Sequence, residues 1–467
     1  MTSSINMPET SALLGGQKNG QVIYSGTINP PSSDSSIGLR KSEYLVRRSN
    51  GNFEEADSGI PMFRAVFVVM NAAMGAGILN FPQAFGKAGG ITAAMSIELV
   101  MLVFITGSFV IMAYCANMCG SRNYQEIVRD MLGTKAYLIS EVFVLLYMLG
   151  SSIAYLILIA DQLEQVGKAL VPGDLWYVSR TFLLCTVTIV FILPLCIPKT
   201  MGILSYTSTA GSLGVLYVCF VAAYKYFSGS YNPSKIQPHV EKPWTDLFGV
   251  IPIICFGFMC HVPALSVYTE LKRPSVPRFG IVCTIAMVLC CTAYSVTACF
   301  GFLTFGAKCK SDILMNYSSN DVMVNIARVA IALVVISTFA SVHFSGRSAV
   351  EGLWLTAWRM TLYEAEINAR KRRVVQTVLW VGFTLLIAVA VSDISYVISI
   401  IGGLAALFIL FFPGACLFKE IMRHRYLTHF QWALLFTSIF YIVMGVFLFG
   451  ESEVLAITED LKPKNLY

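Results

Sequence analysis

Residues 68–85 read VVMNAAMGAGILNFPQAF, an apolar stretch with the character of a membrane-spanning helix and an interruption in its middle. Gly75, Ala76 and Gly77 form that interruption, and Pro82 follows it. In a helix interior, Gly costs about 1 kcal/mol and Pro about 3 kcal/mol relative to Ala. A break leaves backbone N–H and C=O groups unpaired, and lipid cannot satisfy them. The stretch therefore predicts a broken helix whose free backbone groups are buried in protein or line a water-filled cavity.

A second stretch, residues 252–271, is interrupted in a similar way. It reads PIICFGFMCHVPALSVYTEL and places Gly257, His261 and Pro263 near its middle. Two Gly/Pro-interrupted segments at matching places in two five-helix halves are the expected sign of a transporter site between inverted repeats. Small residues in membrane helices also serve packing alone, and the symmetric second break is what favours a site.

Together the two breaks suit a zwitterionic ligand. A half-helix that begins after Gly77 presents free N–H groups and the positive end of its dipole, which suit a carboxylate. Carbonyl groups freed around Phe256 and Gly257 suit an ammonium group. We therefore expect the backbone around these residues, Gly75 and Ala76 included, to bind an amino acid without any charged side chain.

The composition of the whole chain indicates a membrane protein. Of the 467 residues, 56% are hydrophobic and 13% are charged, about half of the ~25% charged residues typical of soluble domains. This balance excludes a soluble enzyme, a disordered scaffold and a nucleic-acid binder. No convergent cluster of nucleophile, base or metal ligands suggests a membrane-embedded enzyme. The expected surroundings are the lipid bilayer.

Apolar segments long enough to span a bilayer, about 20 residues each, follow one another from Pro61 onward. We predict an all-α polytopic membrane protein with a disordered tail at 1–61, a transmembrane domain at 62–450 and a short tail at 451–467. Eleven spans are expected at 62–88, 90–118, 136–164, 180–198, 202–227, 246–270, 279–305, 322–356, 374–391, 394–418 and 429–450.

Lys and Arg in the short loops predict the orientation. One side carries 15 of them and the opposite side 7, and the richer side is expected to be cytoplasmic. The N-terminal tail lies on that side, which places the tail at 451–467 outside or in an organelle lumen. Asn316-Tyr317-Ser318 is an N-glycosylation sequon in a loop that this topology makes luminal or extracellular.

Four strings within residues 61–450 resemble one known family. NAAMGAGILNFPQAFGKAGG (71–90), ICFGFMCHVPALSVY (254–268), HFSGRSAVEGLWL (343–355) and VISIIGGLAALFILFFPG (397–414) are similar to helices one, six, eight and ten of the sodium-coupled neutral amino acid transporters, in the amino acid/auxin permease group. The match is closest to the branch of its seventh and eighth members. The resemblance implies a LeuT-like fold of two inverted five-helix repeats plus an eleventh helix, with helices one and six broken.

The resemblance also implies a sodium site shared by helices one and eight. Asn71 stands at the family's helix-one sodium-linked asparagine, and Thr338, with neighbouring Ser337, stands at the helix-eight hydroxyl ligand. Sodium is a hard cation that takes oxygen ligands, by the logic that holds for calcium. From the residues alone, a helix hydroxyl bonded to its own backbone is the alternative for Ser337 and Thr338.

Two further residues were assigned to the substrate pocket. Met259 stands where the seventh member of the family has Gln at the pocket border. This difference means that the resemblance does not carry a preference for glutamine over to this chain. His261 is either a pocket wall and pH sensor or a neutral histidine bonded to freed backbone.

The leading hypothesis is a secondary active transporter of neutral amino acids, including glutamine, that is coupled to sodium and works by alternating access. A non-transporting amino-acid-sensing receptor and a proton-coupled transporter are the alternatives. In the tail, Glu9, Leu13 and Leu14 resemble an acidic dileucine signal for sorting adaptors. With the family resemblance, this motif favours a lysosomal or endosomal membrane over the plasma membrane.

Overall fold

The computed structural model describes residues 59–121, 123–171, 173, 175–198, 204–231, 243–358, 360, 364, 366–391, 393–424 and 426–461. Regular structure in these ranges is helical, apart from isolated bridge residues, among them the pair Ile60 and Leu271. Most of the predicted tail at 1–61, and with it the Glu9, Leu13 and Leu14 motif, lies outside the described residues.

Seven long α-helices make up most of the fold in the described ranges, and shorter helical segments form the remaining apolar stretches. The long helices are α4, α6, α9, α12, α13, α15 and α18. The bounds are α2 (Met62–Ala73), η2 (Ala76–Asn80), α3 (Phe81–Lys87), α4 (Ile91–Cys119), α5 (Tyr124–Leu132), α6 (Thr134–Leu170), η3 (Trp176–Val178), α7 (Arg180–Val187), η4 (Thr188–Ile192), α8 (Leu193–Cys196), α9 (Leu204–Phe227), η5 (Trp244–Val250), α10 (Ile251–Phe258), α11 (His261–Glu270), α12 (Val276–Phe305), η6 (Gly306–Lys308), η7 (Ile313–Asn316), α13 (Val322–Ala357), α15 (Ala369–Ala390), α16 (Ile394–Ala406), η8 (Leu407–Phe411), α17 (Phe412–Ile421) and α18 (His429–Leu461).

By length and composition, 8 of the described helices can cross a membrane, or 9 if the bent pair Met62–Ala73 and Gly77–Lys87 counts as one span. Two shorter apolar helices, Arg180–Cys196 and Leu213–Phe227, fall at two more of the predicted spans. The prediction of an all-α polytopic membrane protein is therefore confirmed, while the number eleven stays a prediction.

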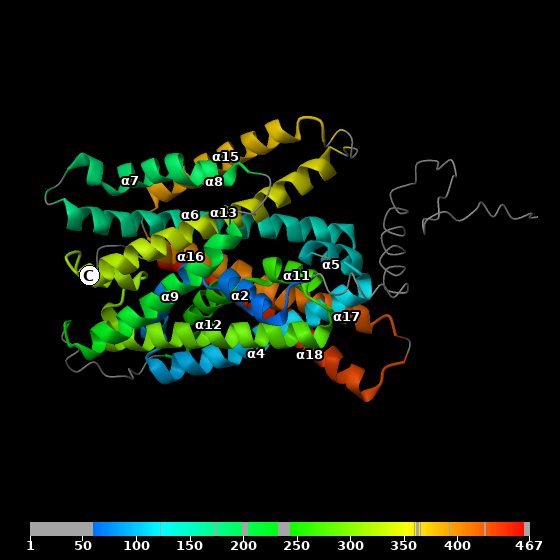
Figure 1. The fold of residues 1–467 in the computed structure, drawn as a ribbon. Helices are drawn as coiled ribbons and strands as arrows, with labels where there is room; N and C mark the ends of the chain where they lie inside the picture. Colours follow the sequence, from blue (N-terminus) through cyan, green and yellow to red (C-terminus); the bar gives the residue numbers. More distant parts are fainter. Residues whose placement is uncertain are drawn as a thin grey trace, which may run out of the picture. The chain divides into compact units, whose positions relative to one another are not determined.

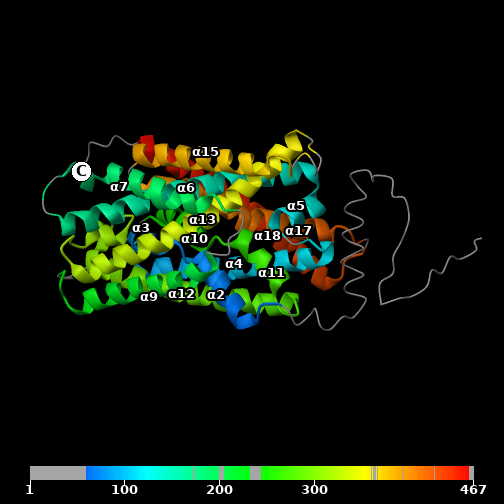
Figure 2. The ribbon, with the colours of Figure 1, turned by 45° about the horizontal axis from the view of Figure 1, so that its top comes forward.

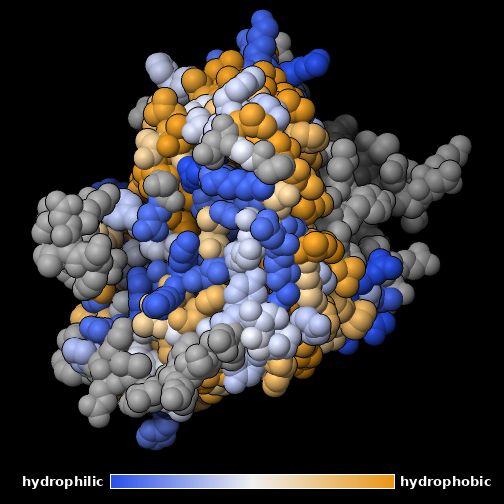
Figure 3. Space-filling model, turned by 90° about the vertical axis from the view of Figure 1, so that its left-hand side faces the viewer, coloured by the Kyte–Doolittle hydropathy of each residue, from blue (hydrophilic) through white to orange (hydrophobic). Residues whose placement is uncertain are grey.

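The helices run back and forth between two ends of the bundle (Figures 1 and 2). We call the end at which α2, α6 and α12 begin the Met62 end. The end at which α4, α7 and α13 begin is the Val322 end, on the left of Figure 1. Seen from the Val322 end, hydrophilic residues cross the middle of the face and hydrophobic side chains lie around them (Figure 3).

Burial separates a central helix from peripheral ones. Of the apolar window in Asp246–Glu270, 83% is buried, against 28% in α15 and in α18. The outer faces of α15 and α18 expose large apolar side chains such as Leu386 and Phe436, as expected where the neighbour is lipid rather than water. The interrupted helix therefore lies in the interior, where its free backbone groups can find protein partners.

Two helical segments widen into π-helix just before a proline. These are η4, followed by Pro194, and η8, followed by Pro413. Proline lacks an N–H group and its ring clashes with the carbonyl group four residues earlier, and a π-turn accommodates such a local mismatch. The helix continues through each of these turns, without the complete break seen near residues 74 and 259.

The last helix is longer than predicted. The expected span ended at residue 450, whereas α18 continues to Leu461. Residues 451–461 contain neither Gly nor Pro, so nothing in the local sequence ends the helix there. Before the first helix, the Ile60 N–H donates to the Glu270 carbonyl (2.8 Å) and the Lys272 N–H to the Ile60 carbonyl (2.9 Å). This bridge joins the start of α2 to the end of α11.

Candidate functional site

The first interruption is present where the sequence predicts it. Helix α2 ends at Ala73, Met74 and Gly75 leave the helical conformation, and helical turns resume at Ala76. The two parts of the span meet at an angle of 53°. The second part therefore begins at Ala76 rather than after Gly77.

The second interruption lies slightly later than predicted. Helix α10 continues through Gly257 to Phe258, and the non-helical residues are Met259 and Cys260 before α11 begins at His261. Cys260 has φ −135° and ψ 17°, outside the helical region. Gly257 is thus part of the helix, and its lack of a side chain serves another purpose.

That purpose is close contact between the two interrupted helices. A Cβ atom on Gly77 would lie 2.7 Å from the Gly257 Cα atom, and a Cβ atom on Gly257 would lie 2.6 Å from Cε2 of Phe81. Both distances are too short for non-bonded carbon atoms, so only glycine allows this approach. The predicted binding glycines Gly77 and Gly257 hold the two breaks against each other.

One hydroxyl group ties both breaks to α12. The Tyr294 hydroxyl lies 2.9 Å from the Ala73 carbonyl oxygen and 2.9 Å from the Gly257 carbonyl oxygen. A hydroxyl has one hydrogen to donate, and here it is shared by the Gly257 carbonyl and by the Ala73 carbonyl, which also accepts from the Gly75 N–H (2.8 Å). The Phe256 carbonyl accepts from the Met259 N–H at 3.4 Å. The carbonyl groups assigned to a substrate ammonium are thus already bonded within the protein.

A cavity of about 210 Å³ lies beside the two breaks. It is bounded by α2, α6, α9, α13 and the chain around the second break. Its walls are formed by Val68, Asn71, Ala72, Tyr147, Met148, Ser151, Tyr155, Gly211, Met259, Pro263, Val334, Ser337, Thr338, Ser341, Val342 and Ser345. None of these described lining residues carries a charge. The wall is mainly apolar, and hydroxyl groups from three successive turns of α13 and from α6 add polar atoms to it.

The three residues predicted to bind sodium are brought together on this wall. Asn71 comes from α2, and Ser337 and Thr338 come from α13. The Ser337 hydroxyl donates to the Leu333 carbonyl (3.1 Å) and the Thr338 hydroxyl to the Val334 carbonyl (2.9 Å), as the alternative interpretation proposed. Because each hydroxyl uses its hydrogen on its own helix, its oxygen lone pairs stay available to accept from a donor or to ligate a cation.

The residues predicted to bind substrate divide into two groups. Met259 lines the cavity, whereas Gly75, Gly77, Phe256 and Gly257 are buried beside it and are absent from its wall. Gly75 lies directly behind the wall, because a Cβ atom there would be 3.1 Å from the hydroxyl oxygen of Tyr155.

His261 faces away from the cavity. Its Nε2 atom lies 2.5 Å from the Ser108 hydroxyl oxygen, and its ring stacks on Phe109 of α4 with the ring centroids 4.0 Å apart. The side chain is fully buried. The structure therefore places His261 in helix packing between α11 and α4, with the Ser108 side chain as the partner of Nε2 rather than the freed backbone of either break.

The cavity lies on the Met62 side of the breaks. Its wall includes Val68 of α2 and Pro263 of α11, but no residue of α3 or α10. On the other side, Phe81 stacks on Tyr294 (4.5 Å between ring centroids) and Phe258 meets Tyr294 edge-on (5.1 Å). This aromatic cluster closes the path from the cavity toward the Val322 end.

Above the aromatic cluster, the loop at 306–321 covers the Val322 end. Arg328, fully buried on α13, donates to the carbonyl oxygens of Leu314 (2.8 Å), Tyr317 (2.9 Å) and Ser318 (3.2 Å). These bonds fix the loop in place, so the buried charge has a structural role.

Asp312 anchors the same loop to α6. Its carboxyl group accepts from the Gln162 amide and from the Leu314 N–H (2.9 Å), and it is almost fully buried. Burial, reinforced by the nearby Asp161 carboxylate, raises the pKa of Asp312 from 3.8 to about 7, although the Leu314 N–H and Arg328 act in the opposite direction. A carboxyl group that titrates near neutral pH thus lies in the cover of the closed end.

Comparison with known proteins identifies the family. The model of the family described as "Transmembrane amino acid transporter protein" matches residues 58–457. This chain is a member of that family. A protein of Danio rerio named "Sodium-coupled neutral amino acid transporter 7" is 39% identical over 87% of this chain and 90% of its own length. "Solute carrier family 38 member 8" of Homo sapiens is 36% identical over 85% of this chain and 93% of its own length.

Solved structures show a similar fold. MhsT in complex with L-phenylalanine aligns with a TM-score of 0.51 at 11% identity, over 83% of this chain and 98% of that one. The inward-facing conformation of Mhp1 aligns with a TM-score of 0.51, also at 11% identity, over 86% and 92% of the two chains. The family resemblance predicted from the four strings is confirmed, and the relatives are named as transporters, not as enzymes.

Three functional candidates in this amino acid transporter were missed from the sequence. Tyr155 lines the cavity, Tyr294 joins the two breaks, and Asp312 anchors the cover. The two tyrosines lie in apolar runs that resemble any other helix interior. The sequence around Asp312 did not indicate that its side chain is buried, because its partner Gln162 is far away in the sequence.

The sequon Asn316 lies at the end of η7 in the same loop. Its side-chain oxygen accepts from the Lys310 N–H (2.9 Å) and its Nδ2 atom donates to the Lys308 carbonyl (2.8 Å). The side chain is half-buried. Glycosylation at Asn316 stays a prediction, and any glycan there would be attached to an amide that also holds the loop.

Proposed function

We propose that this family member is a secondary active transporter of neutral amino acids, with glutamine among its substrates, and that it couples their movement to sodium. The observation that carries the proposal is the uncharged cavity beside two interrupted helices, whose mainly apolar wall holds several hydroxyl groups and one amide. A cavity of about 210 Å³ is smaller than the roughly 300–1,000 Å³ of sites for drug-sized ligands. It therefore suits a small solute whose charges cancel.

Sodium would bind at Asn71, Ser337 and Thr338, with the nearby backbone of the first break. Amide and hydroxyl oxygens are the ligands that a hard cation takes, and all three side chains lie on one wall. A sodium ion and a zwitterion together move one positive charge. One charge crossing 100 mV is worth about 2.3 kcal/mol, enough to sustain a gradient of roughly fiftyfold.

Substrate recognition would use the cavity wall together with the backbone around Gly75 and Ala76. Met259 borders the cavity from the second break, and Tyr155 places a hydroxyl directly in front of Gly75. The carbonyl groups of Phe256 and Gly257 would be available to an ammonium group only after their present bonds rearrange.

Transport by alternating access would require α2, α3, α10 and α11 to move with α4 and α12 against the other helices. The present arrangement, with a cavity on the Met62 side and a covered Val322 end, is one of the two states that such a cycle needs. The pairing of α4 with α12 and of α6 with α13 supports two inverted repeats of five helices, since these are the second and third helices of each half.

The positive-inside pattern supports a cytoplasmic Met62 end, and the tail motif supports a lysosomal or endosomal membrane. With that orientation, the cavity faces the cytoplasm. Glycosylation at Asn316 would then occur on the luminal side, and loss of a glycosidase-sensitive mass shift in Asn316→Gln would verify both the site and the topology.

The test is flux in proteoliposomes with a panel of amino acids, with and without a sodium gradient, at two pH values. We expect sodium-dependent accumulation of neutral amino acids. Binding without accumulation would identify a receptor instead, and accumulation driven by a pH gradient without sodium would identify a proton-coupled transporter. A panel in which only charged amino acids accumulate would refute the role of the neutral cavity.

Thr338→Ala tests the ion site directly. Loss of one oxygen ligand to a cation is comparable with loss of a hydrogen bond to a charged group, about 1.5–3 kcal/mol, so the sodium concentration for half-maximal flux should rise about tenfold or more. The matched control is Ser348→Ala, because Ser348 is an exposed hydroxyl on α13 that bonds the Phe344 carbonyl (2.9 Å) and is not part of the cavity wall. Unchanged sodium dependence in Thr338→Ala would remove the ion-site assignment.

A further inference from the structure

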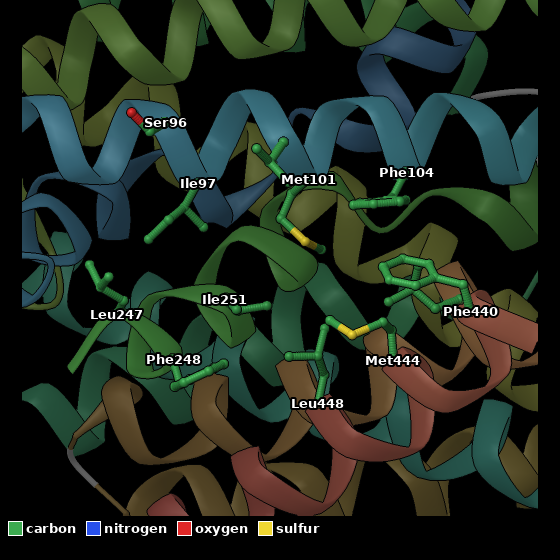
Figure 4. Close-up of a pocket in the computed structure, with 12 residues that line it drawn as sticks. Ser96, Ile97, Met101, Phe104, Leu247, Phe248, Ile251, Phe440, Met444 and Leu448 are labelled. Atoms are coloured by element: carbon green, nitrogen blue, oxygen red, sulfur yellow. The ribbon is translucent and has the colours of Figure 1, made fainter. Parts of the chain in front are cut away.

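A second hollow lies on the outer surface of the bundle, apart from the cavity described above. It is a groove of about 340 Å³ between α4, the segment η5–α10 and α18. Figure 4 shows Ile97 and Met101 of α4 opposite Met444 and Leu448 of α18, with Ile251 of α10 between the two helices. The groove therefore lies where the first half of an interrupted helix meets a peripheral helix.

The lining of the groove is hydrocarbon and thioether throughout, apart from Ser96. The Ser96 hydroxyl donates to the Thr92 carbonyl of its own helix at 2.8 Å, so it is already satisfied. A buried water needs two to four polar partners, and a sterol hydroxyl or a lipid headgroup needs at least one. The chemistry of the groove therefore suits a plain hydrocarbon chain.

One end of the groove is closed at the middle of the membrane. The Phe104 ring stacks on the Phe440 ring with centroids 5.3 Å apart, and the Tyr441 hydroxyl donates to the Phe104 carbonyl at 2.9 Å. Phe104 lies near the middle of α4, whose ends are Ile91 and Cys119. From Ser96 to Phe104 the helix rises about 12 Å, close to half of the roughly 30 Å hydrocarbon core. The groove thus matches the depth of one leaflet.

We propose that this groove binds one acyl chain of a bilayer lipid from the leaflet at the Val322 end. The chain would enter beside Ser96 and end against the Phe104–Phe440 pair. Because Ile251 contributes to the groove, the bound chain would support α10 in its present position between α4 and α18. If α10 moves, the shape of the groove changes with it, and the chain binds the two arrangements with different affinities. The site depends on neither the ion nor the amino acid of the proposed function.

The experiment uses the full chain in phosphatidylcholine liposomes that contain a phosphatidylcholine with a photoactivatable diazirine in one acyl chain. After irradiation, adducts are mapped by mass spectrometry. We expect adducts on residues 96–104 and 440–448 whose yield saturates as the probe fraction rises. Labelling of the exposed face of α15 should instead rise in proportion to the probe. A linear rise at both places would show ordinary surface lipid and overturn the proposal without any variant.

A groove-filling variant adds a second test. Val100 lines the groove one turn from Ser96 and is 56% exposed, so Val100→Trp adds bulk to the groove from its exposed side without disturbing the interior. We expect the probe fraction for half-saturation to rise about tenfold, which corresponds to about 1.4 kcal/mol. The matched control, Leu386→Trp on the outer face of α15, should leave it unchanged. Unchanged saturation in Val100→Trp would overturn the proposal. A parallel experiment with a diazirine sterol would overturn it if the sterol formed the adducts in place of the acyl probe. Chemical cross-linking would overturn it if the groove joined two copies of the chain.

Discussion

Replacement of Asp312 by Asn should remove a pH-dependent contribution to closure of the Val322 end. Asp312 holds the 306–321 loop to α6 through Gln162, and its charged neighbours are Asp161 on α6 and Arg328 on α13. Asp161 itself pairs with Arg180 of α7 at 2.8 Å. When the loop lifts, the carboxyl group of Asp312 meets water and its pKa returns toward 3.8, whereas burial holds it at about 7 in the closed state.

The sign of the effect follows from these two values. The closed state has the higher pKa, so it binds the proton more readily, and acidification stabilises it. The stabilisation is complete below pH 3.8 and is lost as the pH rises through about 7. At pH 7 the closed-state carboxyl is already half protonated, so lowering the pH from 7 to 5 shifts the balance about 50-fold toward closure, or ~2.3 kcal/mol. This is an upper bound, reached when Asp312 becomes fully hydrated on opening.

Hydrogen exchange measures this balance. Backbone amides of residues 309–321 are followed by mass spectrometry in lipid nanodiscs at pH 5 and pH 8, with rates corrected for the intrinsic pH dependence of exchange. The natural chain should be more protected at pH 5. Asp312→Asn, which resembles the protonated acid in having one acceptor oxygen, should show equal protection at both values.

Asp246→Asn is the matched control, because Asp246 is an exposed acid of η5 near the same end. It should retain the pH dependence of the natural chain. The reasoning fails if Asp312→Asn keeps that dependence in full, or if the natural chain shows equal corrected protection at pH 5 and pH 8.

Three further substitutions test contacts that hold the interrupted helices and the loop. Gly77→Ala should lower the stability in detergent by about 1–3 kcal/mol, seen as a lower melting temperature, because its methyl group meets Gly257. Gly382→Ala, with open space around the new Cβ atom, should not. Tyr294→Phe should cost about 1–3 kcal/mol, because the buried Gly257 carbonyl loses its donor and the Ala73 carbonyl keeps only the Gly75 N–H; an unchanged melting temperature would contradict the shared bond. Arg328→Met should cost at least about 2 kcal/mol and speed amide exchange in the 306–321 loop at every pH; slow exchange there would show that other contacts fix the loop.

The helices and their interruptions could be predicted because their signals are local. A run of apolar residues defines a span, and Gly75 or Pro263 marks a break within a single stretch of sequence. The sodium candidates Asn71 and Thr338 were placed by resemblance, and the structure then put them on one wall. Even the late end of α18 has a local cause, since no Gly or Pro follows residue 450 until Pro463.

What could not be predicted depends on which faces meet. Gly77 was assigned to a ligand because its partner, Gly257, lies 180 residues away in the sequence. His261 has the composition of a site residue, but its orientation toward Ser108 and Phe109 is decided by the packing of α11 on α4. Tyr294 and Asp312 acquire their roles only once remote carbonyl and amide groups are placed beside them.

The short bridge between Ile60 and Leu271 has a mechanical consequence. It joins the start of α2 to the end of α11 through main-chain groups alone. A Cβ atom on Gly59 would lie 2.6 Å from the Lys272 backbone nitrogen, which is too close. The start of α2 and the end of α11 are therefore linked directly, so a displacement of one helix end would carry the other with it. Since the bridge uses only main-chain groups, the side chains around it can vary in evolution, provided that the backbone hydrogen bonds and Gly59 are kept.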